Sequence, residues 1–223
     1  QMVSDVPVCS FLSGGIDSSI VTAVASNYLA EKGAQLNTFS FDFKDNDRYF
    51  QPNAFQPNRD RPFVDIMIAA YHLNHTYLEC DDSLLARLLY TAVDAKDLPG
   101  MADIDASLLY FCALVKKSNK VALTGECADE IFGGYPWFYR DELLQANGFP
   151  WSKDTNTRTL LLSDDFAREL QLEDYVYARY TDSLKAVPRL EGEDPVASRR
   201  REIAYLNIKW FMQTLLDRMD RAS

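Results

Sequence analysis

Basic side chains are scarce in this sequence of 223 residues. It has 23 Lys and Arg against 33 Asp and Glu, which gives a formal net charge of −10 at pH 7. A surface that follows a nucleic acid needs a row of Lys and Arg, so we expect no nucleic-acid partner. Long hydrophobic runs are missing too: no stretch reaches the roughly 18 apolar residues of a membrane span, and no signal segment opens the chain. We therefore expect a cytoplasmic protein without a membrane partner.

Cysteine and histidine are also few, and their spacing does not fit the usual zinc patterns. There is no CxxC pair and no His at zinc-ligand spacing, so the cysteines are expected to be free thiols. His72 and His75 stand three apart, but two imidazoles make a poor metal site, and a helix end followed by a loop is favoured. The four cysteines are Cys9, Cys80, Cys112 and Cys127.

The two ends of the sequence predict a fragment of a longer protein. The chain begins with Gln1 and runs within a few residues into a buried-looking strand, and it stops at Ser223 directly after a long helical pattern. Hydrophobic residues make up 47% of the sequence and charged residues 25%, as in ordinary globular domains, so we expect an ordered chain.

Apolar runs and helical patterns alternate over the first 135 residues. Strands are expected at residues 6–12, 37–43, 75–80 and 121–124, and helices at residues 17–32, 64–73, 84–89 and 106–116. This alternation is typical of a doubly wound α/β fold with a parallel sheet. We therefore predict a nucleotide-binding α/β core over residues 1–135.

The character of the sequence changes after Pro136. Polar stretches without a period, at residues 44–60 and 149–158, are expected to be loops. Beyond the second of these the patterns are helical only, at residues 164–171, 173–186 and 195–218. We expect a single domain over residues 1–223, with an all-helical part at 136–223.

The first group of residues that could carry chemistry is SGGIDSS at positions 13–19, between a predicted strand and a predicted helix. Glycines let the backbone approach an anion, hydroxyls donate to phosphate oxygens, and a helix N-terminus adds exposed N–H groups. Asp17 would repel a phosphate unless a divalent cation lay between them. The competing interpretation is a glycine turn with a Ser or Asp helix cap; the dense motif in this context favours a nucleotide site.

The second group is TGECADE at positions 124–130, directly after the fourth predicted strand. Ligands of parallel sheets bind outside the carboxyl ends of the strands, so this segment and the first group should open onto the same crevice. Three carboxylates there can hold Mg²⁺, bind a cation or act as a base. Acidic residues also complement a helix dipole, but the pairing with the first group favours a site.

These residues resemble a known family. Residues 13–19 resemble the pyrophosphate loop of the ATP-pyrophosphatase (PP-loop) group, which GMP, NAD and argininosuccinate synthetases and tRNA-modifying enzymes share. Residues 123–135, LTGECADEIFGGY, resemble the narrower synthetase-domain signature of glutamine-hydrolysing asparagine synthetases, with Cys127 where many members have Gly. The resemblance covers nearly the whole chain and includes residues 38–40, 97–99 and 216–221.

The resemblance implies a fold, a reaction and site residues. The fold is the adenine-nucleotide alpha-hydrolase type (HUP-like). The reaction is that of a C–N ligase (EC 6.3.5.4): ATP and aspartate give β-aspartyl-AMP and pyrophosphate, and ammonia then displaces AMP to give asparagine. Glu126 and Asp129 would be catalytic, with Glu126 accepting a proton from ammonia, and Asp17 and Asp129 would bind Mg²⁺. The nucleotide would be bound by Leu12, Ser13, Gly14, Gly15, Asp17, Ser18, Ser19, Ser40, Thr124 and Gly125.

Two departures from the family limit this expectation. Family members carry an N-terminal glutaminase domain, which we do not expect in these 223 residues, and we expect the family's segment after the DR-x-DR element, with a catalytic lysine, to lie beyond Ser223. Aspartate and ammonia are the expected partners, and ammonia would come from glutamine through the glutaminase domain of the full-length protein. We expect the fragment, which carries the synthetase half only, to bind nucleotide and to be weakly active or inactive. The oligomeric state stays open, a homodimer included.

Three other functions stay open on the sequence alone. A β-lactam synthetase-like or other PP-loop adenylating enzyme has the same layout, and an assay of aspartate against carboxyethyl-arginine would separate the two. A tRNA-thiolating enzyme would share residues 13–19 but should bring basic patches or zinc cysteines. A non-catalytic nucleotide-binding module is the third, against which the retained Asp17, Glu126 and Asp129 count.

Overall fold

The computed structural model describes residues 2–53, 56–152 and 154–223, which form two compact units. The first unit comprises the chain up to Glu126 together with Asp217–Ser223, and the second comprises Cys127–Leu216. Among the described residues, no helix is both long and apolar enough to cross a membrane. The expectation of a single domain with a core over residues 1–135 stays a prediction.

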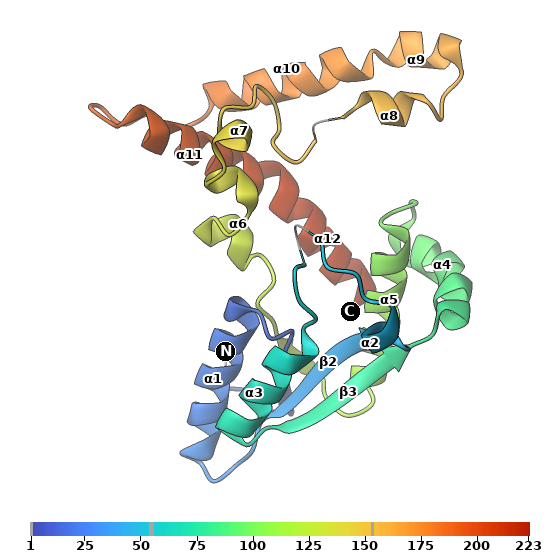
Figure 1. Cartoon of the computed structure of the whole chain (residues 1–223), viewed down its shortest axis with the longest axis vertical. Helices are drawn as coiled ribbons and strands as arrows, with labels where there is room; N and C mark the ends of the chain where they lie inside the picture. Colours follow the sequence, from blue (N-terminus) through green and yellow to red (C-terminus); the bar gives the residue numbers. More distant parts are fainter. Residues whose placement is uncertain (1, 54–55, 153) are drawn as a thin grey trace. The chain divides into compact units, whose positions relative to one another are not determined.

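A parallel sheet of four strands forms the centre of the first unit (Figure 1). The strands are β1 (Val8–Phe11), β2 (Asn37–Phe43), β3 (Asn74–Cys80) and β4 (Val121–Leu123). Their order is β3-β2-β1-β4, with Cys9 beside Asn37 on one side and beside Ala122 on the other. The strand order therefore reverses at β1, and the sheet has its topological switch point between β1 and β4.

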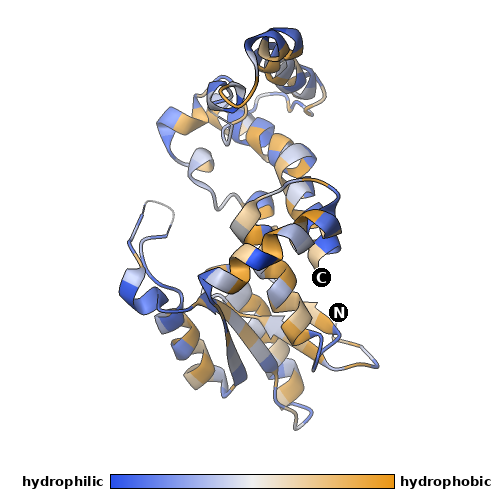
Figure 2. Cartoon of the chain, turned by 90° about the vertical axis from the view of Figure 1, so that its right-hand side faces the viewer, coloured by the Kyte–Doolittle hydropathy of each residue, from blue (hydrophilic) through white to orange (hydrophobic). Residues whose placement is uncertain are grey.

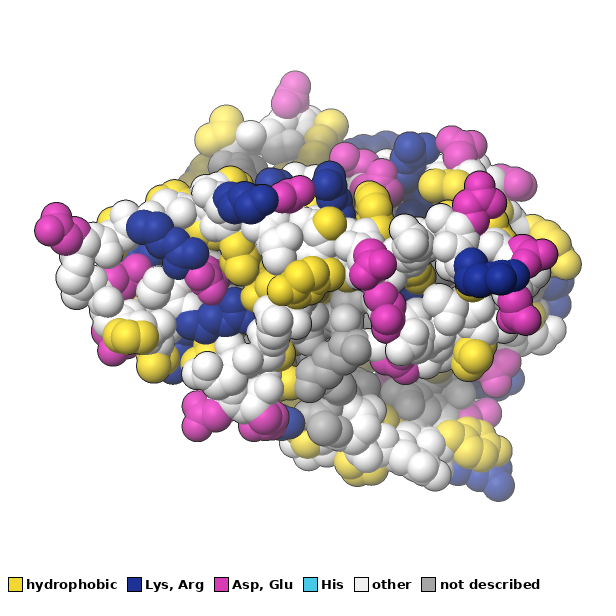
Figure 3. Space-filling model, turned by 90° about the horizontal axis from the view of Figure 1, so that it is seen from above, with side chains coloured by type: hydrophobic (Ala, Val, Ile, Leu, Met, Phe, Trp, Pro, Cys, Tyr) yellow, Lys and Arg dark blue, Asp and Glu magenta, His cyan; other side chains and the backbone are white. Residues whose placement is uncertain are grey.

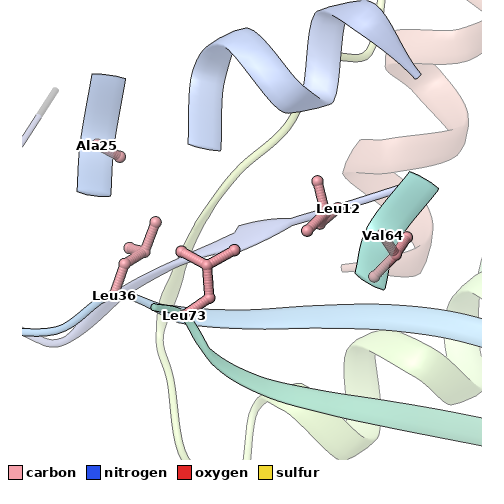
Figure 4. Packing of buried hydrophobic residues seen from close by; sticks show 5 residues of the cluster. All are labelled: Leu12, Ala25, Leu36, Val64 and Leu73. Atoms are coloured by element: carbon pink, nitrogen blue, oxygen red, sulfur yellow. The ribbon is translucent and has the colours of Figure 1, made fainter. Parts of the chain in front are cut away.

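Helices cover both faces of this sheet, as the alternating sequence pattern predicts. They are α1 (Ile16–Ala30), α3 (Arg61–Tyr71) and α5 (Ala102–Val115), and α4 (Asp82–Lys96) packs on α5. On one face α1 and α3 bury a cluster of Leu12, Ala25, Leu36, Val64 and Leu73 (Figure 4). On the other face α5 covers a cluster of Cys9, Phe39, Phe111 and Val115. The α/β fold is thereby confirmed.

Local sequence signals set several helix ends. Helix α1 stops before Gly33, whose φ of +69° is the left-handed conformation that glycine adopts without strain. Pro62 lies in the first turn of α3, and the Asp81 carboxylate caps α4 by accepting from the Leu84 N–H at 2.8 Å. Within the segment 44–60, where the sequence predicted only a loop, there is a short helix α2 (Asn46–Tyr49); its Asn46 amide donates to Asp42 at 2.7 Å.

The second unit is helical in the part of the chain that the structure describes. Its elements are α6 (Ala128–Phe132), a 3₁₀ turn (Pro136–Phe138), α7 (Asp141–Leu144), α8 (Asn156–Thr159), α9 (Asp164–Leu170), α10 (Leu172–Lys185), α11 (Pro195–Leu206) and a π turn (Asn207–Phe211). A buried cluster of Trp137, Phe138, Leu144 and Ile203 holds it together. The expected helical part is confirmed, and its last helix, α12 (Met212–Ala222), continues into the first unit.

The long helix predicted at residues 195–218 is interrupted by that π turn. Asn207 is fully buried, and its side-chain amide donates to the Ile203 carbonyl at 3.1 Å. A side chain that bonds to the carbonyl four residues back competes with the helical backbone bond, which accounts for the local widening of the helix. The apolar spacing runs through this point unchanged, so the sequence pattern does not reveal the break.

Hydrophobic and hydrophilic residues are both present along the helices of the two units, as Figure 2 shows. On the face seen in Figure 3, acidic and basic side chains are interspersed, and the described residues there form no continuous basic band.

Candidate active site

The first predicted group lies at the switch point, between the end of β1 and the start of α1. Helix α1 begins after Gly15, and within the described part of the chain no side-chain hydrogen bond caps it. The first N–H groups of a helix have no intrahelical acceptor, so an uncapped N-terminus offers them to an anion. The competing interpretation of the motif, a Ser or Asp helix cap, is therefore wrong for this helix. Asp17 lies in its first turn and is half-buried.

Hydrogen bonds between two serines shape the loop before α1. Ser18 is buried, and its hydroxyl accepts from the Ser13 N–H at 3.2 Å and donates to the Gly15 carbonyl at 3.2 Å. The hydroxyls of Ser13 and Ser18 lie 2.9 Å apart. The Ser18 hydroxyl is thus used inside the loop, whereas Ser13 and Gly15 are exposed and Ser19 is half-buried.

Gly14 has a structural role that the sequence did not reveal. Its φ is +78°, and a Cβ at this position would lie 2.7 Å from the Cβ of Phe63 and 3.0 Å from the Asp60 carbonyl oxygen. Contacts this short cannot occur, so only glycine fits between the loop and the start of α3. The packing of the loop against α3 therefore explains Gly14 without reference to a ligand.

The second predicted group meets the first at Gly125. A Cβ here would lie 2.7 Å from the Ser18 nitrogen and 2.9 Å from the Asp17 carbonyl carbon. The backbone after β4 therefore runs directly against the first turn of α1, and glycine permits that approach. Residues that are more than 100 positions apart thus come together at the carboxyl ends of β1 and β4, as the topology of the sheet predicted.

Leu12 and Ser40 are predicted to line an adenosine pocket. Leu12 follows β1 directly, Ser40 lies in the middle of β2, and both are buried. The Ser40 hydroxyl donates to the Leu12 carbonyl, and the Leu12 N–H donates to the Phe39 carbonyl at 2.9 Å. The Leu12 side chain belongs to the core beside Val64, as Figure 4 shows. Any contact of Leu12 with a nucleotide therefore has to involve its backbone.

Glu126, the predicted base, follows Gly125 and has a partner that the sequence reasoning missed. Its N–H donates to the Thr124 hydroxyl at 3.0 Å, which fixes the backbone between them. Its Oε1 accepts from Nη2 of Arg218 at 2.8 Å, and the Arg218 side chain is only 14% exposed. Arg218 belongs to the DR-x-DR element, but its separation of 92 residues from Glu126 hides the pair from any local pattern.

Two further motif segments are brought together on the same unit. Arg221, in the last turn of α12, donates to Asp97 at 3.2 Å. Close by, the buried Asp105 accepts from the Met101 N–H at 2.9 Å and from Lys96 at 3.4 Å. These contacts join the DLP segment at 97–99 to the C-terminal turn of α12, both of which the resemblance included.

Asp129 and Glu130 belong to the second unit, where they begin helix α6. Glu130 is buried, and the Tyr135 hydroxyl donates to its Oε1 at 2.6 Å, so this carboxylate serves the local fold. Gly134 packs so closely on Asp129 that a Cβ there would lie 1.8 Å from Asp129 Oδ1. These contacts explain in physical terms why glycine follows the acidic segment.

Cys127 departs from the family pattern at a position with a special backbone conformation. Its φ is +69°, in the left-handed region, and it stands immediately before α6. Glycine adopts this conformation freely, whereas another residue is strained there by about 1 kcal/mol. The preference for Gly in the family therefore has a conformational reason as well as one of side-chain size.

The described residues contain no group of three or more His, Cys, Asp and Glu side chains that could hold a metal ion by themselves. Mg²⁺ in nucleotide sites is ordinarily held by one or two carboxylates together with phosphate oxygens and water. A single half-buried carboxylate, Asp17, in the first turn of a phosphate-binding type of helix fits that donor set. The absence of a closed protein cage is thus compatible with Mg²⁺ bound along with a nucleotide.

Known proteins are similar to this chain over its whole length. The model of the asparagine synthase family matches residues 1–223. Asparagine synthetase 3 (glutamine-hydrolyzing) of Bacillus subtilis (strain 168) is 50% identical over 100% of this chain and 36% of its own length. Asparagine synthetase 1 (glutamine-hydrolyzing) of the same organism is 34% identical over 64% of this chain and 20% of its own length. The chain thus spans about a third of the first of these relatives.

A solved structure of a universal stress protein in complex with cAMP is also similar, at 16% identity over 54% of this chain and 97% of that chain, but its TM-score of 0.24 is too low to support an argument. The family match, in contrast, agrees with the motifs at residues 13–19 and 123–135 and with the α/β fold of adenine-nucleotide alpha-hydrolase type. On these grounds the chain belongs to the asparagine synthase family.

Proposed function

We propose that the protein forms a carbon–nitrogen bond by adenylating the side-chain carboxylate of aspartate and transferring the acyl group to ammonia. The observation that carries the proposal is the contact of Gly125 with the first turn of α1, because it joins the two motif segments at the switch point of the sheet. The names of the relatives support asparagine as the product and glutamine as the source of ammonia. A cytoplasmic location and a homodimer stay predictions.

In the first step the aspartate carboxylate attacks the α-phosphorus of ATP, and pyrophosphate leaves. The loop from Ser13 to Ser19 would hold the β- and γ-phosphates through backbone N–H groups of the uncapped helix and through exposed hydroxyls. Leu12, Ser40 and Thr124 would adjoin the adenosine. Fixing the leaving group and the attacking oxygen in line is the main contribution a protein makes to this type of reaction.

Asp17 and Asp129 are the residues proposed to hold Mg²⁺ together with the phosphates. When bound, the ion would neutralise the charge that develops on the leaving pyrophosphate. The formal charge of −10 gives this proposal a further reason, since carboxylates close to a phosphate site repel a nucleotide in the absence of a cation.

In the second step ammonia attacks the acyl carbon of β-aspartyl-AMP, and AMP leaves. Glu126 would accept the proton that the attacking nitrogen loses. It lies next to Gly125 and therefore at the same edge of the sheet as the loop before α1. This is the role that the synthetase-domain motif implies for the residue.

The test is ATP–pyrophosphate exchange on the protein that contains these residues, with aspartate, glutamate or carboxyethyl-arginine as the acid and with or without Mg²⁺. We expect exchange that needs both aspartate and Mg²⁺, and ammonia-dependent release of asparagine and AMP. Exchange that depends on carboxyethyl-arginine instead would reassign the protein to a β-lactam synthetase-like reaction. Nucleotide binding without exchange for any acid would contradict an adenylating function altogether.

A further inference from the structure

The pair between Arg218 and Glu126 is held from the arginine side by packing that does not involve Glu126. Arg218 and Ala222 on α12 line a narrow gap with Ala92 on α4 and Leu109 on α5. Met219, next to Arg218, lines a groove along α5 that also contains Cys112 and Leu109. The end of α12 therefore packs against α4 and α5. This packing orients the Arg218 side chain toward Glu126, in the segment after β4.

The contact is poorly explained as a device for stability. The Nε of Arg218 is buried and has no hydrogen-bond partner among the residues that the structure describes. A buried donor without a partner destabilises a fold, and the attraction within a partly buried ion pair often does not compensate for its desolvation. A cation kept in this position at a cost in stability suggests a functional role.

A second pair on the same helix provides a contrast. Arg221 contacts Asp97 at 3.2 Å and Asp217 at 3.5 Å, and both its side chain and that of Asp97 are open to solvent. Exposed ion pairs of this kind contribute little to stability. Of the two arginines in the DR-x-DR element, Arg218 is the less exposed, and it is the one that contacts the predicted base.

We propose that Arg218 is the positioning residue for Glu126 in the amide-forming step, an inference that rests on the proposed function. Its Nη2 holds Oε1 of the carboxylate and leaves Oε2 to receive the proton. The hydrogen bond from the Glu126 N–H to Thr124 fixes the backbone at the same time. One fixed oxygen and one fixed backbone group together define where Oε2 lies.

In the amide-forming step Glu126 takes up one proton, and AMP leaves with one electron pair. The lone pair of ammonia forms the C–N bond at the acyl carbon, and the carbonyl electrons move to oxygen. A proton passes from nitrogen to Oε2 of Glu126, the carbonyl re-forms, and the C–O bond to the phosphate of AMP breaks with its electron pair on AMP. Glu126 then returns the proton to solvent, and Arg218 keeps its charge throughout.

The experiment separates the two steps in three variants of the protein that contains these residues: Arg218→Met, Arg218→Lys and, as a matched control on the same helix, Arg221→Met. Aspartate-dependent ATP–pyrophosphate exchange reports the first step, and ammonia-dependent asparagine formation reports both. We expect Arg218→Met to lower kcat for asparagine about 30-fold to 100-fold, the scale of a misplaced catalytic group, with exchange and the KM for aspartate nearly unchanged. Arg218→Lys should restore part of the loss, and Arg221→Met should be close to normal.

Two outcomes would overturn the assignment. An equal loss of exchange and of asparagine formation in both Arg218 variants would mean that Arg218 holds the substrate and not Glu126. If Arg218→Met is partly unfolded, a double variant that combines Arg218→Lys with Glu126→Gln decides the question. If Arg218 acts through Glu126, the double variant should be no slower than Glu126→Gln alone. Additive losses of activity would contradict action through Glu126. If the unmodified protein fails to catalyse ATP–pyrophosphate exchange, the proposed function itself is contradicted. A loss that is seen only in the variants bears on Arg218 alone.

Discussion

Gly125 is the single residue on which the geometry of the candidate site depends most. An alanine there would bring a Cβ within 2.7 Å of the Ser18 nitrogen, so the segment after β4 or the first turn of α1 has to move. We expect Gly125→Ala to weaken binding of Mg²⁺–ATP by about tenfold or more, the usual cost of displaced phosphate ligands. Isothermal titration calorimetry measures the change.

The control for this variant is Gly192→Ala. Gly192 also has a positive φ, of +72°, but no atom lies within 4 Å of an added Cβ. Its substitution should cost about 1 kcal/mol of stability through backbone strain and leave the affinity for ATP unchanged. Equal affinities of the Gly125→Ala and unmodified proteins would show that the contact with α1 is not needed for nucleotide binding.

The two serines at the start of α1 are expected to differ in what they contribute. Ser18 is buried and makes the hydrogen bonds that shape the loop, so Ser18→Ala should lower the free energy of unfolding by about 1–3 kcal/mol. Ser19 is half-buried and its hydroxyl has no such bond within the described residues. Ser19→Ala should therefore weaken ATP binding with little effect on stability. Chemical denaturation and calorimetry on both variants separate the roles; identical profiles would contradict this division.

At the scale of elements, Arg199 joins three helices of the second unit. From α11 it donates to the Leu144 carbonyl at 2.8 Å and the Ala146 carbonyl at 2.6 Å, at the end of α7. It also contacts the Tyr180 hydroxyl of α10 at 3.0 Å. The planar guanidinium serves these acceptors at once, which an ammonium group cannot do.

We therefore expect Arg199→Lys to destabilise the second unit by about 2–3 kcal/mol, because carbonyls lose their donors inside the fold. Arg179→Lys is the control, since Arg179 is exposed and contacts Asp182 and the Tyr175 ring on its own helix; it should change stability by less than about 0.5 kcal/mol. Urea denaturation followed by tryptophan fluorescence reports on the Trp137 cluster. Similar midpoints for the two variants would show that the Arg199 contacts carry little energy.

At the scale of the whole molecule, His75 should make stability depend on pH. Burial between β2 and α3 lowers the pKa of His75 to about 4, with a smaller opposing effect of Asp65 and a smaller supporting effect of Arg61. The ring is held by the Thr38 hydroxyl at 2.8 Å from Nδ1. Below the ordinary pKa of about 6.5 the unfolded chain binds a proton that the folded chain does not.

This contribution to stability is therefore complete above pH 6.5 and is lost as the pH falls toward 4. We expect His75→Gln to have a flatter decline of unfolding free energy over that interval than the unmodified protein. Denaturation curves at several pH values measure it. His72→Gln is the control, because His72 is exposed at the end of α3, and it should leave the slope unchanged. A slope unchanged in His75→Gln as well would rule out His75 as the cause.

The parts of the fold that follow from neighbouring residues were predictable, and the parts that depend on distant ones were not. Strand β2 occupies the residues 37–43 that its apolar alternation predicted, and helix α1 lies within the predicted range 17–32 except for its first residue, Ile16. The π turn at Asn207 arises from one buried amide inside an unbroken apolar pattern, and the short helix α2 lies in a stretch without a period. Tertiary contacts override the local pattern at both places.

The candidate site shows the same division. The motifs placed Asp17 and Gly125 at the ends of β1 and β4, because parallel strands share one functional edge. Two features could be found only in the three-dimensional structure. One is the close approach of Gly14 to Phe63, which requires glycine, and the other is the pairing of Arg218 with Glu126. Arg218 and Glu126 are 92 positions apart, so the sequence motifs alone do not predict their contact.

The first unit is discontinuous in sequence: one segment ends at Glu126, and the second begins at Asp217. During synthesis on the ribosome, the sheet and its helices emerge well before the arginines that pair with Glu126 and Asp97. The α/β layer therefore stays incomplete until the intervening helices have been synthesised. During this time α12 does not yet cover the groove along α5. Contacts of such long sequence separation slow folding, so this interval is the period in which the chain is most exposed to misfolding and to chaperones.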